Sequence, residues 1–239
     1  MTDIAIGITT RNRPEAFLTT LDRLIRFKPN NAEIFVVDDA SHSINLMQYA
    51  EWVNHFFIER AGIPKAKNKS LELCYNTGSK HIFLFDDDIY PIKEGWELPY
   101  IKSGIHHLSY NFDKAYQGTP KRQSKEINGF KISQIPNGCM LYFTRECIDK
   151  VGGFNEGFGL GLYEHTDFTR RIHNAGLTPY KNMDVIGSEK LFYSMDEHGE
   201  IERNFSINER VRYLNEGRYL FNQLAASEEY VEFREKDLI

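Results

Sequence analysis

Three consecutive carboxylates, Asp86, Asp87 and Asp88, follow directly after an apolar run over residues 81–85. Short apolar runs bounded by polar residues are typical of buried strands in a parallel sheet. Such sheets bind ligands beyond the C-terminal ends of their strands. Three adjacent negative charges repel one another, and a divalent cation with a phosphate ligand would compensate them. The run therefore predicts a core strand that ends at a metal and phosphate site; the alternative is an Asp-rich solvated turn.

The composition sets the class of protein that could carry such a site. The chain has 239 residues, 41% hydrophobic and 13% aromatic, which suits one large domain, or a domain with an appendage, around a real core. A net charge of −5 argues against a general nucleic-acid binder, which usually has a basic face. The three widely separated cysteines, Cys74, Cys139 and Cys147, form neither a disulfide framework nor a zinc ribbon and indicate a reducing compartment. No signal-peptide pattern and no apolar run of about 20 residues is present, so we expect a cytoplasmic protein without a membrane span.

Predicted strands and helices, which would position the acids, alternate through the first 90 residues. We expect strands over residues 3–10, 33–37, 55–58 and 81–85. Helices are expected over residues 14–27, from Ser41 or Ser43 through Trp52, and over 64–77 with Gly78 at its C-terminal end. This rhythm is typical of a doubly wound parallel sheet. Asp38 and Asp39 end the second strand, and Thr9 and Thr10 end the first, so polar groups are expected to line a cleft at one sheet edge.

The pattern changes after Asp88. We expect a helix over residues 96–108, with Trp96 either in the core or stacked on a ligand. Residues 112–134, with Lys121, Arg122 and Lys125, are expected to form a β-excursion or a mobile loop that could order over a bound ligand. A strand over 138–144, a helix capped by Thr144, a glycine-rich segment over 152–161 and a helix over 163–176 follow. Strand-like segments near Val185 and Leu191 precede a last helix over 207–224.

Four segments, in order, resemble the inverting glycosyltransferases of family 2, which have the GT-A fold. They are Ile8 to Pro14, Val36 to Ser41, Phe85 to Asp88, and a block from Gly152 to Glu156 with Glu164, Asp167 and Arg171. The third resembles the D-x-D metal motif. The fourth resembles the family's G-G-F-D-E…E-D-x-D…R pattern and is galactosyltransferase-like. Each segment is short, but the ordered set over roughly residues 4–176 is specific.

The resemblance implies an α/β protein of the GT-A type: a Rossmann-like, doubly wound, mostly parallel sheet with a smaller acceptor-side subregion. It implies a nucleotide-sugar-binding half over residues 1–110 and an acceptor and catalytic half of the same domain over 111–205. Residues 206–239 would form a C-terminal helical extension. It also implies transfer of a hexose, with inversion, from a nucleotide sugar, expected to be a UDP-sugar, to an acceptor hydroxyl with Mn²⁺ or Mg²⁺ as cofactor.

The donor-side residues follow from the matched segments. Asp38 or Asp39 could accept a hydrogen bond from a uracil N–H; the alternative is that they cap the next helix. Thr9, Thr10 and Arg11 lie on the neighbouring strand end. Lys67 stands where the family usually has arginine. Lys67, or else Lys65, could reach the ribose or diphosphate, and the alternative is a solvated lysine. Asp86 and Asp87 complete the predicted donor site.

For the metal, Asp88 is the first candidate ligand and Asp86 the second, because hard carboxylate oxygens suit Mn²⁺ or Mg²⁺. Several enzymes of this fold bring a C-terminal histidine back to the ion, which makes His198 a candidate third ligand. An imidazole ligand would favour Mn²⁺. The alternative is a surface histidine in a polar turn.

The general base is where this sequence departs from the family, which usually has an aspartate at the position of His165. Histidine is a competent base near neutral pH. Glu164, His165 and Asp167 are all candidates, His165 by position and Asp167 by chemical type. Alternatively, His165 only begins a helix while Asp167 pairs with Arg170 or Arg171.

Two rival functions differ from this interpretation. A sugar-nucleotide pyrophosphorylase would need a glycine-rich phosphate loop after the first strand, and Ile8 to Pro14 contains no glycine. A catalytically inactive nucleotide-sugar or carbohydrate-binding module stays open because of His165, and it would bind the nucleotide without turnover. The acceptor could be a glycan, a lipid-linked sugar or a protein, and no nucleic-acid partner is expected.

Overall fold

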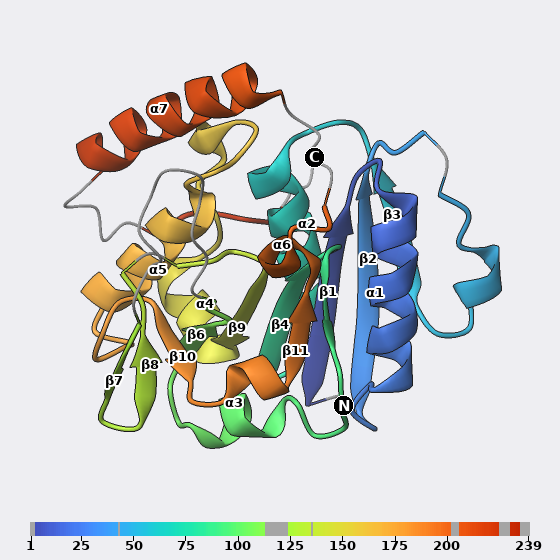
Figure 1. The fold of residues 1–239 in the computed structure, drawn as a ribbon, viewed down its shortest axis with the longest axis horizontal. Coiled ribbons are helices and arrows are strands. Elements are labelled where there is room, and N and C mark those ends of the chain that lie inside the picture. Colours follow the sequence, from blue (N-terminus) through green and yellow to red (C-terminus); the bar gives the residue numbers. More distant parts are fainter. Residues whose placement is uncertain are drawn as a thin grey trace.

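Six strands form the central sheet, in the order β3-β2-β1-β4-β9-β6 (Figure 1). Their bounds are β1 Ile4–Thr10, β2 Ala32–Asp39, β3 Asn54–Ile58, β4 His81–Asp86, β6 His107–Ser109 and β9 Met140–Thr144. Within this sheet β9 is the one strand that runs against the others. The predicted doubly wound, mostly parallel α/β sheet is therefore confirmed. The structure, a computed structural model, describes residues 3–42, 44–112, 124–134, 136–201, 206–224 and 230–234.

Helices cover both faces of the sheet. Their bounds are α1 Pro14–Arg26, α2 Ile63–Asn76, α3 Leu98–Lys102, α4 Arg145–Val151, α5 Glu164–Asn174, α6 Met195–His198 and α7 Ile207–Gln223. Because side chains alternate along a strand, Ile6 of β1 packs with Phe17 of α1 on one face. Ala5 packs with Leu71 of α2 on the other, where α4 and α5 also contribute. Two apolar layers thus hold β1, β2 and β4 in the middle of the molecule.

Two small sheets flank the central one. One has the order β10-β8-β7, with bounds β7 Lys125–Ile127, β8 Phe130–Ile132 and β10 Met183–Val185. The other pairs β5 Ile89–Pro91 with β11 Phe192–Ser194. Since β5 follows the three aspartates directly, this pairing brings α6 next to them: the backbone N–H of Met195 donates to the carbonyl of Asp88 at 2.9 Å.

Two predicted helices are wrong. After Ser41 the chain has one short 3-10 turn, Met47–Tyr49, among the described residues 44–53; Ser43 lies outside the description. The helix expected over 96–108 is shortened to α3, because Gly104 takes a φ of 70° and the chain then joins β9 as β6. Trp96 lies in the core, fully buried, and its Nε1 donates to the carbonyl of Phe27 at 3.0 Å. The β-excursion is present as β7 and β8, whereas Lys121 and Arg122 lie outside the described residues.

The remaining helices lie close to the predicted ranges. α2 ends before Gly78, whose φ is 80°, and the Thr144 side chain caps α4 by accepting from the Cys147 N–H. α7 begins with a capping box between Ser206 and Glu209 and crosses one end of the molecule (Figure 1). β9 belongs to the central sheet although it follows residue 110 in sequence, so both proposed halves share this sheet; the division at residue 110 stays an interpretation. None of the described helices combines the length and apolar character that crossing a membrane requires.

Close packing of α2 on β1 depends on Gly7. A Cβ at this position would lie 2.0 Å from Ser70 Oγ and 2.8 Å from Leu84 Cδ2. Gly7→Ala should therefore lower the free energy of unfolding by about 1–3 kcal/mol, measured by urea denaturation. Ser70→Ala added to it should restore part of the loss because it removes the nearest atom, with Ser70→Ala alone as the control. An unchanged midpoint in Gly7→Ala would contradict this packing.

Candidate functional site

The C-terminal ends of three parallel strands meet at one edge of the sheet. The register places Thr9 beside Asp86 and Thr10 beside Asp38. The loops that leave this edge adopt unusual backbone conformations, with φ of 50° at Asn12 and 58° at Ala40. Strain of this kind collects at functional sites when surrounding contacts hold it. Here the Asn12 backbone N–H donates to Ser41 Oγ at 2.9 Å, and the Asn12 side chain accepts from the His42 N–H at 3.0 Å.

Arg13 compensates two of the three aspartates. Its guanidinium donates to Asp88 Oδ2 at 2.9 Å and to Asp87 Oδ1. Thr10 Oγ1 donates to the other oxygen of Asp87 at 2.8 Å, so both oxygens of this carboxylate are bonded inside the protein. Asp87 is 1% exposed. The structure therefore does not place Asp87 at a surface where a donor could touch it.

Burial and mutual repulsion still disfavour the ionised forms of the three aspartates, despite their cationic partners. Burial raises the pKa of Asp87 to about 6, although Arg13 opposes the shift. Burial also raises the pKa of Asp88, again against Arg13, and the charges of Asp86 and Asp196 add to the rise. The pKa of Asp86 is raised by burial, with Lys67 opposing. A cation bound here would stabilise the ionised carboxylates and lower their pKa.

Lys67 compensates the third aspartate and also reaches the other side of the site. Its Nζ lies 3.1 Å from Asp86 Oδ1 and 3.5 Å from Glu164 Oε1, and it donates to the carbonyl of Gly138 at 2.9 Å. The side chain is only 3% exposed. Lys67 thus points inward between two carboxylates, which differs from the solvated lysine considered from the sequence.

Glu164 and His165 form a pair at the start of α5. His165 Nδ1 lies 3.2 Å from Glu164 Oε1. Burial would raise the pKa of Glu164, but His165 and Lys67 beside it lower the pKa well below the ordinary value. The ring of His165 lies against Gly138, where a Cβ would come within 2.7 Å of it. Glu164 is therefore an ionised partner that can hold the ring of His165 in one orientation.

Asp167 lies in a different environment from this pair. Its two oxygens accept from Arg170 at 2.9 Å and from Arg171 at 2.9 Å, and all three side chains are buried. Arg171 also donates to the carbonyls of Val151 and Gly153. Asp167 thus holds Arg171, which links α5 to the start of the glycine-rich segment, and this is the pairing that the sequence offered as the alternative to a base.

The two acids that end β2 have separate contacts. Asp39 accepts from the backbone N–H groups of Ala61 at 2.6 Å and Gly62 at 3.3 Å, so it fastens the chain just before α2. Asp38 Oδ1 accepts from the Ser41 N–H at 2.8 Å. Because no contact of its second oxygen is seen among the described residues, Asp38 is the better placed of the two to accept from a ligand.

The residues around Asp88 fit a hard cation. Asp88 Oδ1 is buried and has no hydrogen-bond partner among the described residues. His198 Nδ1 contacts the carbonyl of Ser194 at 2.9 Å and the ring stacks on Tyr193, which leaves Nε2 as the nitrogen that could bind a metal, so its role as a third ligand stays a prediction. In the described part of the chain no three acid, imidazole or thiol groups converge as a complete metal cage. A Mg²⁺-type ion is usually held by one or two carboxylates plus substrate phosphates, and this pattern suits Asp88.

Comparison with known proteins identifies the family. A model described as Glycosyl transferase family 2 matches residues 5–138, more than half of the chain. The chain belongs to glycosyl transferase family 2. An uncharacterized glycosyltransferase of Acanthamoeba polyphaga mimivirus is 26% identical over 184 residues, which cover 72% of this chain and 70% of the relative. This family 2 chain is therefore a transferase.

Solved glycosyltransferase structures share the GT-A fold with this family 2 chain. The TarS fragment 1–349 of S. aureus, solved with UDP-GlcNAc, is 14% identical, with a TM-score of 0.58 over 94% of this chain and 73% of that one. The mannosyltransferase PcManGT of Pyrobaculum calidifontis, solved with GDP-Man and Mn²⁺, is 16% identical, with a TM-score of 0.55 over 78% and 55%. GalNAc-T7, solved with UDP, GalNAc and Mn²⁺, is 14% identical, with a TM-score of 0.58 over 76% of this chain. The chain spans 42% of GalNAc-T7.

Sequence reasoning missed two residues of the site. Arg13 lies within the matched segment from Ile8 to Pro14, but its pairing with Asp87 and Asp88 spans more than 70 positions and has no local signal. Asp196 lies two residues before His198, on α6, and its charge acts on Asp88. The polar segment over residues 194–199 was the available signal, but the strand pairing that decides which of its side chains faces Asp88 is a tertiary contact.

The arginine clamp on Asp167 predicts a structural role. Asp167→Ala should lower the free energy of unfolding by about 3–5 kcal/mol, because it leaves Arg171 buried without its counter-charge. Urea denaturation would measure the loss. Glu216→Ala is a matched control, since it removes an exposed pair with Arg212 on α7 and should change stability by less than about 1 kcal/mol. A variant Asp167→Ala with normal stability but no turnover would instead place Asp167 in the chemistry.

Proposed function

We propose that this protein transfers a hexose, with inversion, from a UDP-sugar to an acceptor hydroxyl, with a divalent cation at Asp88. The observation that carries the proposal is the buried Oδ1 of Asp88, which has no hydrogen-bond partner among the described residues, while the charge of Asp196 acts on the same carboxyl group. It is supported by relatives solved with UDP, UDP-GlcNAc or GDP-Man, two of them with Mn²⁺.

The donor would occupy the edge formed by β1, β2 and β4. Asp38 would accept from the base, and Thr9 and Arg11 lie on the adjoining strand end and loop. The cation would be held by Asp88, with Asp86 or Asp196 near it. When bound, it would neutralise charge that develops on the leaving diphosphate. Arg13, which already faces Asp88, adds a positive charge on the same side.

His165 is the proposed general base. If Nδ1–H donates to the ionised carboxylate of Glu164, the imidazole must carry its lone pair on Nε2. That nitrogen can take the proton of an acceptor hydroxyl. Lys67 keeps Glu164 ionised and also binds Asp86, so one buried cation joins the base side of the site to the donor side. In an inverting transfer, the acceptor hydroxyl attacks the sugar carbon from the side opposite to the leaving diphosphate. The proposed base, His165, and the proposed diphosphate site at Asp88 would lie on these two opposite sides.

The proposed metal site predicts different effects for substitutions at Asp88 and at its neighbour Asp87. Asp88→Asn should reduce Mn²⁺-dependent turnover of a UDP-sugar on the order of 100-fold, because several kcal/mol of charge stabilisation are lost. EDTA should have the same effect on the unmodified protein. Isothermal titration of UDP with and without Mn²⁺ would show the loss of metal-assisted binding. Asp87→Asn is the contrasting variant. Both oxygens of Asp87 are bonded by Thr10 and Arg13, so this change should lower the midpoint of unfolding. Full activity of Asp88→Asn in EDTA would refute a metal at this residue.

The base assignment is tested by the pH dependence of turnover. His165→Ala should lower kcat by about 10²–10⁴-fold, the usual contribution of a general base. His165→Asp should recover part of the rate and move the acidic limb of the pH–rate profile to lower pH, because a carboxylate loses its proton at lower pH than an imidazole. His173→Gln, on the same helix and bonded to the Thr178 carbonyl, is the control. An unchanged kcat in His165→Ala would place the base elsewhere.

A further inference from the structure

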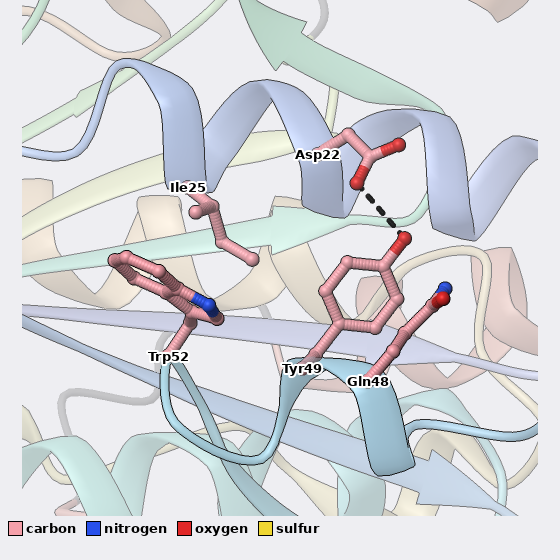
Figure 2. A pocket seen from close by; sticks show the side chains of 5 residues that line it. All are labelled: Asp22, Ile25, Gln48, Tyr49 and Trp52. Carbon is pink, nitrogen blue, oxygen red and sulfur yellow. Dashed lines mark hydrogen bonds between the residues drawn. The ribbon is translucent and has the colours of Figure 1, made fainter.

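A second hollow lies away from the strand ends, between α1 and the 3-10 turn Met47–Tyr49 (Figure 2). It is lined by Asp22, Ile25, Gln48, Tyr49 and Trp52 and has a volume of about 330 Å³. The hollow is shallow and open to solvent, so it would hold a ligand against one face and would not enclose it. Asp22 lies nine residues after Arg13 in the numbering, which corresponds to about 14 Å along a helix axis. The hollow is therefore separate from the site around Asp88.

Two aromatic rings border this hollow. Figure 2 shows Trp52 and Tyr49 side by side on one wall, with Ile25 projecting from α1 toward them. The Trp52 side chain is 55% exposed, whereas the chain's other tryptophan, Trp96, is fully buried. A tryptophan is a large apolar group with one polar N–H, so it suits ligands that are apolar on one face and polar at the edge. The hollow thus offers an aromatic surface that nothing in the described residues covers.

Polar groups surround this aromatic surface in a fixed arrangement. Tyr49 Oη donates to Asp22 Oδ1 at 2.8 Å, which orients the carboxylate (Figure 2). The second oxygen of Asp22 is an acceptor, the carboxamide of Gln48 offers a donor and an acceptor, and the indole of Trp52 offers a donor. A pyranose ring has the matching chemistry: C–H groups on its face and hydroxyl groups around its edge.

We propose that this hollow is a carbohydrate subsite that holds a neutral sugar unit of an acceptor glycan. The C–H face of the sugar would pack on Trp52 while its hydroxyls bond Asp22 and Gln48. Asp22 carries the one formal charge among the five lining side chains, and its carboxylate can accept hydrogen bonds from the hydroxyls of a neutral sugar. The link to an acceptor rests on the proposed function; the binding of sugar does not.

A second copy of the chain fits this surface less well. Apolar Met47, which precedes Gln48, is exposed and could favour self-association. However, a protein surface laid over the hollow would take the Asp22 carboxylate out of water without a counter-charge among the lining side chains, which is costly. Sugar hydroxyls would instead donate hydrogen bonds to that carboxylate.

The two tryptophans allow a direct test with the intact protein. Since Trp96 is buried, acrylamide should quench the fluorescence of Trp52 selectively. The first probes are four neutral oligosaccharides, each at up to about 10 mM: maltotetraose, cellotetraose, xylotetraose and chitotetraose. A glycan array with labelled protein follows. We expect at least one neutral glycan to protect Trp52 with a Kd of millimolar order, as for a single shallow subsite. Trp52→Ala should abolish binding of that glycan and Asp22→Asn should weaken it about tenfold.

Controls separate this site from the transferase reaction. Met47→Ala alters an exposed neighbour that does not line the hollow and should bind the glycan normally. Trp52→Ala should leave UDP binding with Mn²⁺ unchanged and raise KM for the glycan acceptor without changing kcat. If a glycan protects Trp52 from quenching but the protein shows no turnover, the proposed function is contradicted and the subsite is supported. No Trp52-dependent glycan on the array, or a dimer in sedimentation that Trp52→Ala dissociates, would overturn the subsite.

Discussion

Compensation of like charges is the constraint on which the site depends. Three aspartates in succession can end a buried strand because two cations reach them from different elements: Arg13 from the start of α1 and Lys67 from α2. Removing Arg13 would leave Asp87 and Asp88 buried without a counter-charge, and removing Lys67 would take one from the buried Glu164. Either loss costs far more than the loss of an exposed ion pair. The compensation is incomplete, since one buried oxygen of Asp88 has no hydrogen-bond partner in the part of the chain that the structure describes. A closed structural salt bridge would use both oxygens, and this difference is what supports the proposed cation at Asp88.

α2 carries the contacts that join the two sides of this site. Lys67 contacts Asp86 at the end of β4 and Glu164 at the start of α5. The next residue, Asn68, accepts from the backbone N–H of Phe154 at 2.8 Å and donates to its carbonyl at 2.9 Å, which fixes the glycine-rich block. Gly7 allows α2 to approach β1 closely. The spacing between a strand-end acid and the Glu164–His165 pair is therefore set by one helix packed on one strand.

Much of the fold could be predicted from local patterns. The four parallel strands, α1, α2, α4, α5 and α7 follow from apolar periodicity and from caps such as Thr144 and Gly78. The prediction failed between residues 43 and 53 and near residue 105, where short segments take their conformation from contacts with distant elements. At the site, the sequence grouped Asp86, Asp88, Lys67, Glu164 and His165, all of which the structure brings together. It could not distinguish Asp87 from its neighbours, because hydrogen bonds to Thr10 and Arg13 decide that difference.

The sequence by itself determined the sheet, the order of the motifs and the family, because strand and helix periodicity and short motifs are properties of neighbouring residues. The tertiary structure alone decided how the charges are partnered. Arg13 reaches Asp87 and Asp88 across more than 70 positions, Lys67 reaches Glu164 across almost 100, and Asp167 is held by two arginines on its own helix rather than left to face the site. Which carboxylate is free to react depends on which cation lies within about 4 Å of it, and folding sets those distances.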